Sequence, residues 1–448
     1  MIANVVTDES ITRPVDPKNG SGPLWAFGSR TIVRNENCVY AVIPETGQDV
    51  KPLCNTRWTL WRRPDGGRWE QVSAGAGFNE REPCLLARLP DGQLLISTNP
   101  AQTVTGANPK GSSWKCMPQL VRISPGPPAK LLQTITPHWN KPYPFSEHSY
   151  RGMAADAKSG RIFITNQIAI SPNNFVWMLL DKNGSALSQG ELLFPMRGCY
   201  QQIAVNGNAV FIMAVSDEIE PNQEWSEFKE KLLGPGWWKY VFRNIYFTMT
   251  PDALNESFGP VSTIASCDST AGMMRNLDLS VDAKGDAHIL FLERNIDVYA
   301  MRDRFFPNQP FTHALRYLVV RNGRVVSRQT LTEVTEDMSA PRPKPPNKEP
   351  VWLGAAKFKP GWATFHTAAD QSLYVLYMLE SGSEQQLWIR KIYPADSAPP
   401  QQIKLQQRMT QFNAVSTRNG CMPCNIIDLY GCTGTGDIRY VQIRLEPR

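Results

Sequence analysis

Asp282-Ala-Lys-Gly-Asp-Ala-His-Ile-Leu-Phe-Leu292 consists of a turn followed by a short apolar strand. Asp and Gly favour the turn, and the residues after it alternate as a strand with two different faces requires. The same combination recurs along the whole chain. It is found in Leu89–Ser97, Asp156–Thr165, Val205–Met213, Val320–Val326, Asp370–Tyr377 and the closing Tyr440–Leu445. This repetition predicts an all-β protein built of hairpins.

The spacing of the hairpins predicts a β-propeller rather than a single sandwich, because they recur at intervals of roughly 25 to 75 residues. Six to eight blades of ~50 to 60 residues would account for the whole chain. One short helix is predicted in a long loop, over Asn222–Leu233, since Gly234-Pro235 is a stop signal for helices. Residues 1–25 are predicted to be an N-terminal extension and residues 26–448 a single propeller domain.

The composition fits such a fold and excludes other classes of protein. The 448 residues include 36 Pro, 31 Gly and 13 Trp, which suits a large protein with many turns and aromatic strands. With 42% hydrophobic and 20% charged residues, wholesale disorder is excluded. No run of about 18 apolar residues occurs, so no membrane-spanning helix is expected. Met1 to Arg13 contain no apolar leader core, and we expect a secreted or periplasmic protein whose signal peptide is absent from this sequence.

The charge balance bears on the class of partner. The 47 Lys and Arg residues against 41 Asp and Glu residues give a net charge of +6, which is a weak basic bias. Arg342–Lys348 comes nearest to a basic block, and its prolines favour a surface linker over a nucleic-acid site. No nucleic-acid partner is therefore expected, whereas an acidic polysaccharide or oligosaccharide would suit the positive charge. We expect the protein to act as a monomer.

Three of the nine cysteines, Cys421, Cys424 and Cys432, lie close together in the sequence. Three thiolates at this spacing could hold a structural zinc ion with a fourth ligand from elsewhere, or two of them could form a disulfide. Plain thiols are the simpler interpretation. The acidic stretch Asp217–Glu224 could similarly hold a cation such as calcium, or could cap the predicted helix. No cofactor is expected to be required for catalysis.

Polar side chains gather just before several predicted strands. His148, Tyr150 and Arg151 lie within four residues, and a histidine beside a phenol and a guanidinium can transfer protons. A histidine that caps a blade turn is the alternative interpretation. Arg197 and Tyr200 precede the next strand in the same way, where Tyr200 could equally be a packing aromatic.

Two further arginines stand among aromatic or acidic residues. Arg243 lies in Tyr240–Tyr246, a stretch of alternating aromatics, where a guanidinium needs a partner such as an anionic ligand. Arg275 precedes Asn276 and Asp278, and an internal brace between arginine and aspartate is the alternative interpretation there.

Taken in order, these motifs resemble those of one family. They are Arg81-Glu82-Pro83-Cys84, Glu147-His148-Ser149-Tyr150-Arg151-Gly152, Cys199-Tyr200, Glu220-Pro221, Glu224-Trp225, Tyr240-Val241-Phe242-Arg243 and Arg275-Asn276-Leu277-Asp278. They resemble the BNR-repeat, sialidase-like bacterial propellers that include ulvan lyases and enzymes acting on rhamnosyl-glucuronate linkages. Trp61–Trp69, with Asp65-Gly66-Gly67, likewise resembles the Asp-box of such propellers. The resemblance covers about residues 30 to 330 and implies a seven-bladed propeller.

The resemblance implies β-elimination from a uronic-acid polymer. In such lyases a cation neutralises the uronate carboxylate, while a histidine and a tyrosine act as base and acid. His148 then corresponds to the catalytic histidine and Arg243 to the neutralising arginine, with Tyr200 as a candidate acid. The residues expected to bind the substrate are Tyr150, Arg151, Arg197, Tyr246 and Arg275.

Two positions depart from the family pattern and leave other functions open. A second family histidine corresponds to the neighbourhood of Asn166, and the family tyrosine to Phe228, which cannot transfer a proton. Another tyrosine could replace it, or His148 could serve both steps; the candidate tyrosines are Tyr200, Tyr240 and Tyr246. The alternatives are a non-catalytic glycan-binding propeller and a rhamnosidase-like or sialidase-like hydrolase with two carboxylates roughly 5 to 10 Å apart. The candidate carboxylates are Glu82, Glu147, Asp217 and Asp278.

Overall fold

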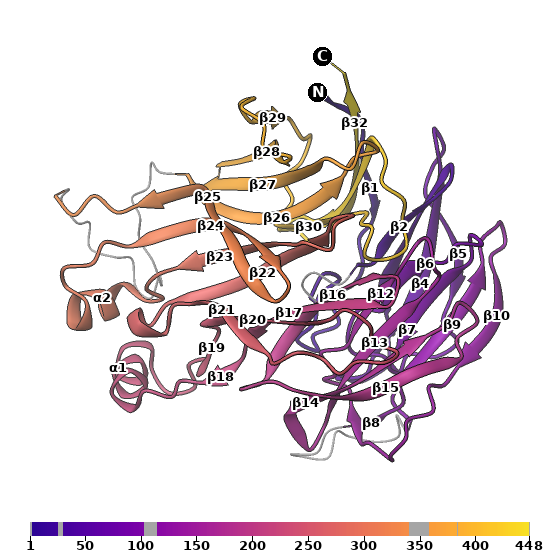
Figure 1. Cartoon of the computed structure of the whole chain (residues 1–448), viewed down its shortest axis with the longest axis horizontal. Coiled ribbons are helices and arrows are strands. Elements are labelled where there is room, and N and C mark those ends of the chain that lie inside the picture. Colours follow the sequence, from indigo (N-terminus) through magenta and orange to yellow (C-terminus); the bar gives the residue numbers. More distant parts are fainter. Residues whose placement is uncertain (1, 26–29, 103–113, 340–357, 383, 448) are drawn as a thin grey trace.

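The structure is a computed structural model that describes residues 2–25, 30–102, 114–339, 358–382 and 384–447. It contains seven four-stranded antiparallel sheets, arranged as the blades of a propeller (Figure 1). Within nearly every sheet, strands that follow one another in the chain also lie side by side. The prediction of an all-β, seven-bladed propeller is therefore confirmed. The proline-rich stretch Arg342–Lys348 lies outside the described residues.

The first four blades run in chain order, each with its innermost strand first. Blade 1 contains β2 (Ile32–Asn35), β3 (Cys38–Thr46), β4 (Thr56–Pro64) and β5 (Glu70–Ala74). Blade 2 contains β6 (Leu85–Arg88), β7 (Leu94–Thr98), β9 (Gln119–Ser124) and β10 (Lys130–Ile135). Blade 3 contains β12 (Gly152–Ala155), β13 (Ile162–Ile168), β14 (Ser171–Leu180) and β15 (Ala186–Leu193). Blade 4 contains β16 (Gly198–Asn206), β17 (Ala209–Ser216), β20 (Asn244–Thr250) and β21 (Ser262–Ser266).

The remaining blades complete the ring. Blade 5 contains β22 (Met273–Val281), β23 (Ala287–Arg294), β24 (Thr312–Arg321) and β25 (Arg324–Thr335). Blade 6 contains β26 (Lys359–Thr367), β27 (Leu373–Ser381), β28 (Glu384–Tyr393) and β29 (Gln401–Ile403). Blade 7 contains β30 (Gln411–Ala414), β31 (Ile426–Cys432), β32 (Ile438–Glu446) and β1 (Ile2–Thr12). Two small ribbons pair β8 (Lys115–Cys116) with β11 (Phe145–Ser146) and β18 (Glu218–Ile219) with β19 (Tyr240–Val241).

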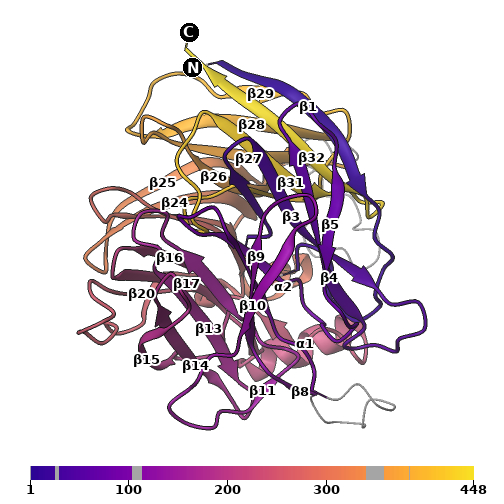
Figure 2. The ribbon, with the colours of Figure 1, turned by 90° about the vertical axis from the view of Figure 1, so that its right-hand side faces the viewer.

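Both ends of the chain build blade 7. β1 pairs antiparallel with β32 and forms the outer edge of that sheet, from Ile2 opposite Glu446 to Thr12 opposite Ile438. The two termini consequently lie side by side, as Figures 1 and 2 both show. Residues 1–25, predicted from the sequence to be an extension, thus contribute a strand to the propeller.

In the part of the chain that the structure describes, two short helices interrupt the strands. α1 (Gln223–Leu233) begins after Asn222, whose side chain accepts a hydrogen bond from the Trp225 amide, and ends at Gly234, much as predicted. The second helix, α2 (Tyr299–Phe305), is not predicted by the sequence, because it has seven residues and no side-chain cap. A single 3₁₀ turn covers Asp268–Thr270. Among the described residues, no helix is long and apolar enough to cross a membrane.

The up-and-down path of the strands gives the propeller two different faces. The hairpin turns between the first and second strands of every blade lie on one face, which we call the turn face. The segments that enter each blade, and those between its second and third strands, lie on the opposite face, which we call the loop face. The longest connections, including both helices, belong to the loop face.

Candidate functional site

Side chains from three parts of the chain gather on the loop face at blades 3 and 4. His148 and Tyr150 lie just before β12, and Tyr200 lies near the start of β16. The ring centroids of His148 and Tyr150 are 4.4 Å apart, and those of Tyr150 and Tyr200 are 5.2 Å apart. Trp25 contacts all three rings, at 5.2 to 5.8 Å. We call Trp25, His148, Tyr150 and Tyr200 the aromatic cluster.

The backbone is strained at both tyrosines. Tyr150 has a φ of 41° and Tyr200 a φ of 52°, in the left-handed region that bulky side chains rarely adopt. At Tyr200 the pairing of β16 with β17 shifts register between Cys199 and Gln202, which is a bulge that redirects the side chain. Such strain persists where the surroundings impose it, and it concentrates at functional sites.

His148 is oriented by a buried carboxylate. Its Nδ1 lies 3.1 Å from Oε1 of Glu82, which also accepts hydrogen bonds from the amide and the hydroxyl of Ser149. Burial alone would raise the pKa of Glu82, but the hydrogen bond and charge of His148 and the charge of Arg151 lower it more. Glu82 therefore remains a carboxylate that fixes the imidazole ring, as in many proton-transferring histidines.

A second carboxylate lies behind Tyr150 and Arg197. The phenol of Tyr150 donates to Oδ2 of Asp217 at 2.9 Å, and Nη2 of Arg197 is 2.5 Å from the same oxygen. The Arg197 guanidinium also lies over the ring of Tyr150, at 5.4 Å, and over that of Tyr240, at 5.1 Å. Burial raises the pKa of Asp217, although Arg197 and Tyr150 act in the opposite direction.

The two phenols of the cluster are held in their protonated form. Burial is the main reason that the pKa values of Tyr150 and Tyr200 are both raised, and the nearby Cys199 and Asp217 add to the effect. A phenol with a raised pKa stays neutral and can donate a proton.

The groups of the site differ in how far they reach the solvent. The side chains of His148 and Arg197 are 28% and 18% exposed, whereas those of Glu82 and Asp217 are 2% and 1% exposed. The imidazole and the guanidinium thus face outward, and the two carboxylates support them from behind. This arrangement suits proton transfer by the imidazole next to a fixed positive charge.

Arg151 lies beneath the site instead of facing a ligand. It is buried, and its guanidinium is 3.3 Å from Glu82 and 3.8 Å from Glu80. Glu80 accepts two hydrogen bonds from the backbone amide of Asn99, at 3.0 and 2.9 Å. Burial raises the pKa of Glu80 to about 7, against the opposing charge of Arg151. Arg151 therefore stabilises two buried glutamates beneath the site.

Arg243 is not placed as the sequence resemblance implies. Its side chain is 1% exposed, and its two terminal nitrogens lie 3.0 and 2.5 Å from the two carboxylate oxygens of Glu220. Lys229 of α1 binds the same carboxylate at 3.1 Å, and the ring of Trp225 covers the guanidinium at 5.1 Å. Because a buried bidentate pair is costly to break, Arg243 holds α1 against blade 4, and Arg197 is the arginine beside the aromatic cluster.

Two other predicted binding residues, Tyr246 and Arg275, pack against aromatic rings that do not belong to the cluster. Tyr246 is 2% exposed and packs against Phe194 at 6.0 Å, so it belongs to the core between blades 3 and 4. Arg275 lies over the ring of Trp362 at 5.6 Å, on the side of blade 6. Burial and the charge of Arg294 lower the pKa of Arg275, while the nearby Tyr200 acts in the opposite direction.

The two positions that depart from the family pattern have structural roles. Phe228 lies in α1 and packs edge-on against Phe305 of α2, with ring centroids 5.4 Å apart. Asn166 is buried in β13, opposite Val176. Neither side chain is part of the aromatic cluster. Tyr150 is the phenol beside His148, and Tyr200 lies on Tyr150 and Trp25.

The sequence did not point to Trp25 or to the roles of Glu82 and Asp217. Trp25 lies outside any strand, so no periodic pattern marks it. The sequence names Glu82 and Asp217 as carboxylates of a hydrolase, Glu82 also within a family motif and Asp217 also within the acidic stretch, but not as partners of His148 and Tyr150. Their partners His148 and Tyr150 are each more than 60 residues away in the chain. Pairings at such a separation leave no local signal.

The cysteines and the acidic stretch do not assemble a metal site. Within the described residues, no group of three or more His, Cys, Asp or Glu side chains could hold a metal ion. The three clustered cysteines are free thiols; Sγ of Cys424 contacts the carbonyl of Ile426, and Sγ of Cys432 lies near Thr410. In the acidic stretch, Glu220 is neutralised by Arg243 and Lys229.

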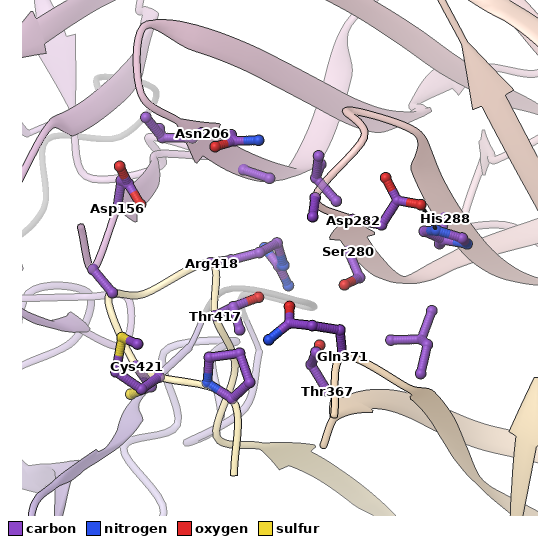
Figure 3. Close-up of a pocket in the computed structure, with 18 of the residues that line it drawn as sticks. Asp156, Asn206, Ser280, Asp282, His288, Thr367, Gln371, Thr417, Arg418 and Cys421 are labelled. Carbon is purple, nitrogen blue, oxygen red and sulfur yellow. Dashed lines mark ion pairs between the residues drawn. The ribbon is translucent and has the colours of Figure 1, made fainter. Parts of the chain in front are cut away.

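A pocket of about 140 Å³ lies at the opposite end of the propeller, on the turn face (Figure 3). Arg418 extends into it from the loop between β30 and β31 and donates to Oδ1 of Asp278 at 2.9 Å. Arg30 binds the other oxygen of Asp278. Burial would raise the pKa of Asp278, but the two arginines lower it more. Asp278, named above as a candidate carboxylate, thus belongs to an internal ion cluster and lies apart from Glu82 and Asp217.

No family model matches the sequence, and no curated protein matches it either. Among solved structures, the polysaccharide lyase Uly1 is similar over 99% of both chains, at 11% identity and a TM-score of 0.51. A protein of unknown function from Dyadobacter fermentans is similar over 99% of both chains, at 10% identity and a TM-score of 0.47. The α-L-arabinanase of Penicillium chrysogenum, solved with arabinobiose, is similar over 98% of both chains, at 11% identity and a TM-score of 0.43. The likeness is one of fold.

Proposed function

We propose that this protein is a carbohydrate-active enzyme that cleaves an acidic, uronic-acid-containing polysaccharide by β-elimination. The observation that carries the proposal is the pair of partly exposed side chains of His148 and Arg197, with the buried Glu82 and Asp217 behind them. The family resemblance of the sequence and the fold shared with a polysaccharide lyase support it.

In the proposed reaction, Arg197 binds the carboxylate of the uronic acid and stabilises the negative charge that develops when the C5 proton leaves. His148, in its neutral form and oriented by Glu82, removes that proton. The C4–O4 bond breaks as a double bond forms between C4 and C5, and the departing O4 takes a proton from a phenol. Tyr200 is the first candidate for this acid, because its raised pKa keeps the phenol protonated within the aromatic cluster.

A glycoside hydrolase is the second candidate, because Glu82 and Asp217 lie on the same face around the aromatic cluster. Hydrolysis would need one carboxylate to act as acid and the other as base or nucleophile. Both carboxylates are almost completely buried and bind His148, Ser149, Tyr150 or Arg197. Their burial favours elimination by His148 over hydrolysis.

The test is to incubate the protein with polygalacturonate, alginate, glucuronoxylan, chondroitin sulfate and ulvan. The ultraviolet absorbance of the unsaturated uronate and the number of reducing ends are then measured. We expect both to rise together on one of these polymers, and His148→Ala to lower kcat by about 10²–10⁴-fold, the usual contribution of an acid–base group.

His138→Ala is the matched control, because His138 is exposed and lies before β11, away from the cluster. It should retain full activity. New reducing ends without the absorbance change would establish hydrolysis instead of elimination. Binding without any product would favour a non-catalytic propeller, and a His148→Ala variant with normal turnover would remove His148 from the mechanism.

A further inference from the structure

Next to the aromatic cluster, the loop face carries an unusually exposed tryptophan. Trp238 is 70% exposed, although tryptophan is on average one of the more buried residues. Its ring lies 5.1 Å from that of Tyr240, at an angle of 45°. Ile219, paired with Tyr240 in the β18–β19 ribbon, is 58% exposed. Three large apolar side chains thus form a surface that the fold itself does not bury.

This surface is continuous with the proposed catalytic residues. The Arg197 guanidinium lies over the ring of Tyr240 at 5.1 Å on one side and over that of Tyr150 at 5.4 Å on the other. Tyr150 in turn contacts His148 at 4.4 Å. A row of groups in contact therefore runs from Trp238 at its outer end to His148 at its inner end.

The segment that carries Trp238 is held in place by several contacts. The amide of Glu220 donates to the carbonyl of Lys239 at 2.9 Å, which extends the β18–β19 ribbon. The neighbouring Trp237 lies under the ammonium group of Lys229 at 5.6 Å. The exposed ring is thus presented by an anchored ribbon, and little conformational entropy is lost when a ligand binds it.

The chemistry of the row suits a chain of uronic acids. Aromatic rings bury the apolar C–H face of a pyranose ring while its hydroxyl groups remain in water. Arg197, between two such rings, is a charged donor for a carboxylate through Nη1, while Asp217 holds its Nη2. A second protein would be expected to need a wider apolar surface than these three side chains.

We infer that Trp238 and Tyr240 form an outer sugar-binding subsite. This subsite stacks against one sugar of a glycan chain, while the reacting uronic acid of the same chain lies at the aromatic cluster. This inference rests on the proposed function and extends it, because it makes the enzyme specific for extended chains rather than for terminal disaccharides. Binding energy from the outer subsite would then be used to place the reacting sugar.

The inference is tested by Trp238→Ala in the otherwise unchanged protein, with the cleaved polysaccharide and its shortest cleavable fragment as substrates. The KM for the polymer should rise roughly tenfold, as for the loss of one stacked sugar contact of about 1.4 kcal/mol. The KM and kcat for the shortest fragment should not change. With Trp238→Phe instead of Trp238→Ala, the KM for the polymer should return most of the way to the native value.

Ile170→Ala is the matched control, since Ile170 is 82% exposed in the β13–β14 connection on the same face but outside the row. An equal rise in KM for polymer and fragment would place Trp238 at the reacting sugar and overturn the outer subsite. Unchanged KM values for Trp238→Ala would overturn it as well.

A binding measurement separates this inference from the proposed reaction. Affinity electrophoresis in gels containing the same five polysaccharides reports binding without turnover, for the His148→Ala protein with and without Trp238→Ala. Weaker binding on loss of Trp238, with no cleavage by the native protein, would support the subsite and refute the lyase. Cleavage with undiminished binding would refute the subsite and support the lyase, and an absence of both binding and cleavage would refute the two together.

Discussion

Two regions of the propeller contain buried charges, but they use them differently. Between the innermost strands, Arg30, Asp278 and Arg418 bind one another and are all nearly inaccessible. On the loop face, Glu82 and Asp217 are equally buried, yet each supports a group that remains partly exposed. A candidate site is therefore recognised by side chains that pair with a buried charge and still reach the solvent. The number of charged residues in a region does not reveal such a site.

The contacts around Arg418 strengthen this contrast. The side-chain amide of Asn419 donates to the carbonyls of Ile32 and Leu86, at 2.9 and 3.1 Å, and so ties the loop to blades 1 and 2. The backbone of Gly420 packs so closely that an added Cβ would lie 1.9 Å from the carbonyl oxygen of Arg88. The loop is thus held against the neighbouring blades by polar contacts and close packing, whereas the loop face keeps the exposed Trp238.

The largest effect on stability is expected from Asp278→Asn. Removing the shared carboxylate leaves two buried guanidinium groups without their counter-charge, which should lower the free energy of unfolding by about 3–5 kcal/mol. Urea denaturation followed by tryptophan fluorescence measures the change. Asp91→Asn, in an exposed turn, is the control and should be nearly neutral. A loss below about 1 kcal/mol would show that the cluster is not the stabilising element described here.

The pH dependence of stability should come from the loop face. Because the pKa of Glu80 is raised from 4.5 to about 7, the folded protein holds a proton that the unfolded chain releases between these values. Stability from this group is complete below pH 4.5 and is lost as the pH rises through about 7, a change of about 3 kcal/mol. Glu80→Gln should remove this share of the slope in denaturation curves measured across this range, while Glu218, whose burial raises its pKa to about 6, keeps its own share.

Asp278 provides the contrasting pH signature. The pKa of Asp278 is lowered from 3.8. Its contribution to the free energy of unfolding is therefore present above pH 3.8 and is lost only as the pH falls further. An unchanged slope between pH 4.5 and 7 in Glu80→Gln would show that another group titrates there.

A smaller effect distinguishes close packing from backbone conformation. Gly420 and Gly285 both have a positive φ, of 80° and 85°, but a Cβ at Gly285 would meet no atom within 4 Å. Gly285→Ala should cost about 1 kcal/mol from the backbone alone. Gly420→Ala should cost about 2 kcal/mol more, since the added methyl group displaces the loop from Arg88. Thermal denaturation compares the two variants, and equal losses would contradict the tight contact at Gly420.

Residues 282–292 and similar hairpins could be predicted because their signals are local. A turn residue fixes the reversal, and alternation of apolar side chains fixes which face is buried. α1 was predictable for the same reason, with Asn222 at its start and Gly234 at its end. Even the neighbourhood of His148 and Tyr150 was visible, because both lie in one short segment before a strand.

The tertiary structure alone decided which charged groups are available. Arg197 and Arg243 stand in similar sequence contexts, at the edges of strands in blade 4, yet Glu220 and Lys229 enclose Arg243 while Arg197 remains beside Tyr150. The sequence by itself thus determined the hairpins, the blades and one helix, whose signals extend over a few neighbouring residues. Which arginine faces a ligand depends on residues brought together from distant parts of the chain, and no local pattern records those contacts.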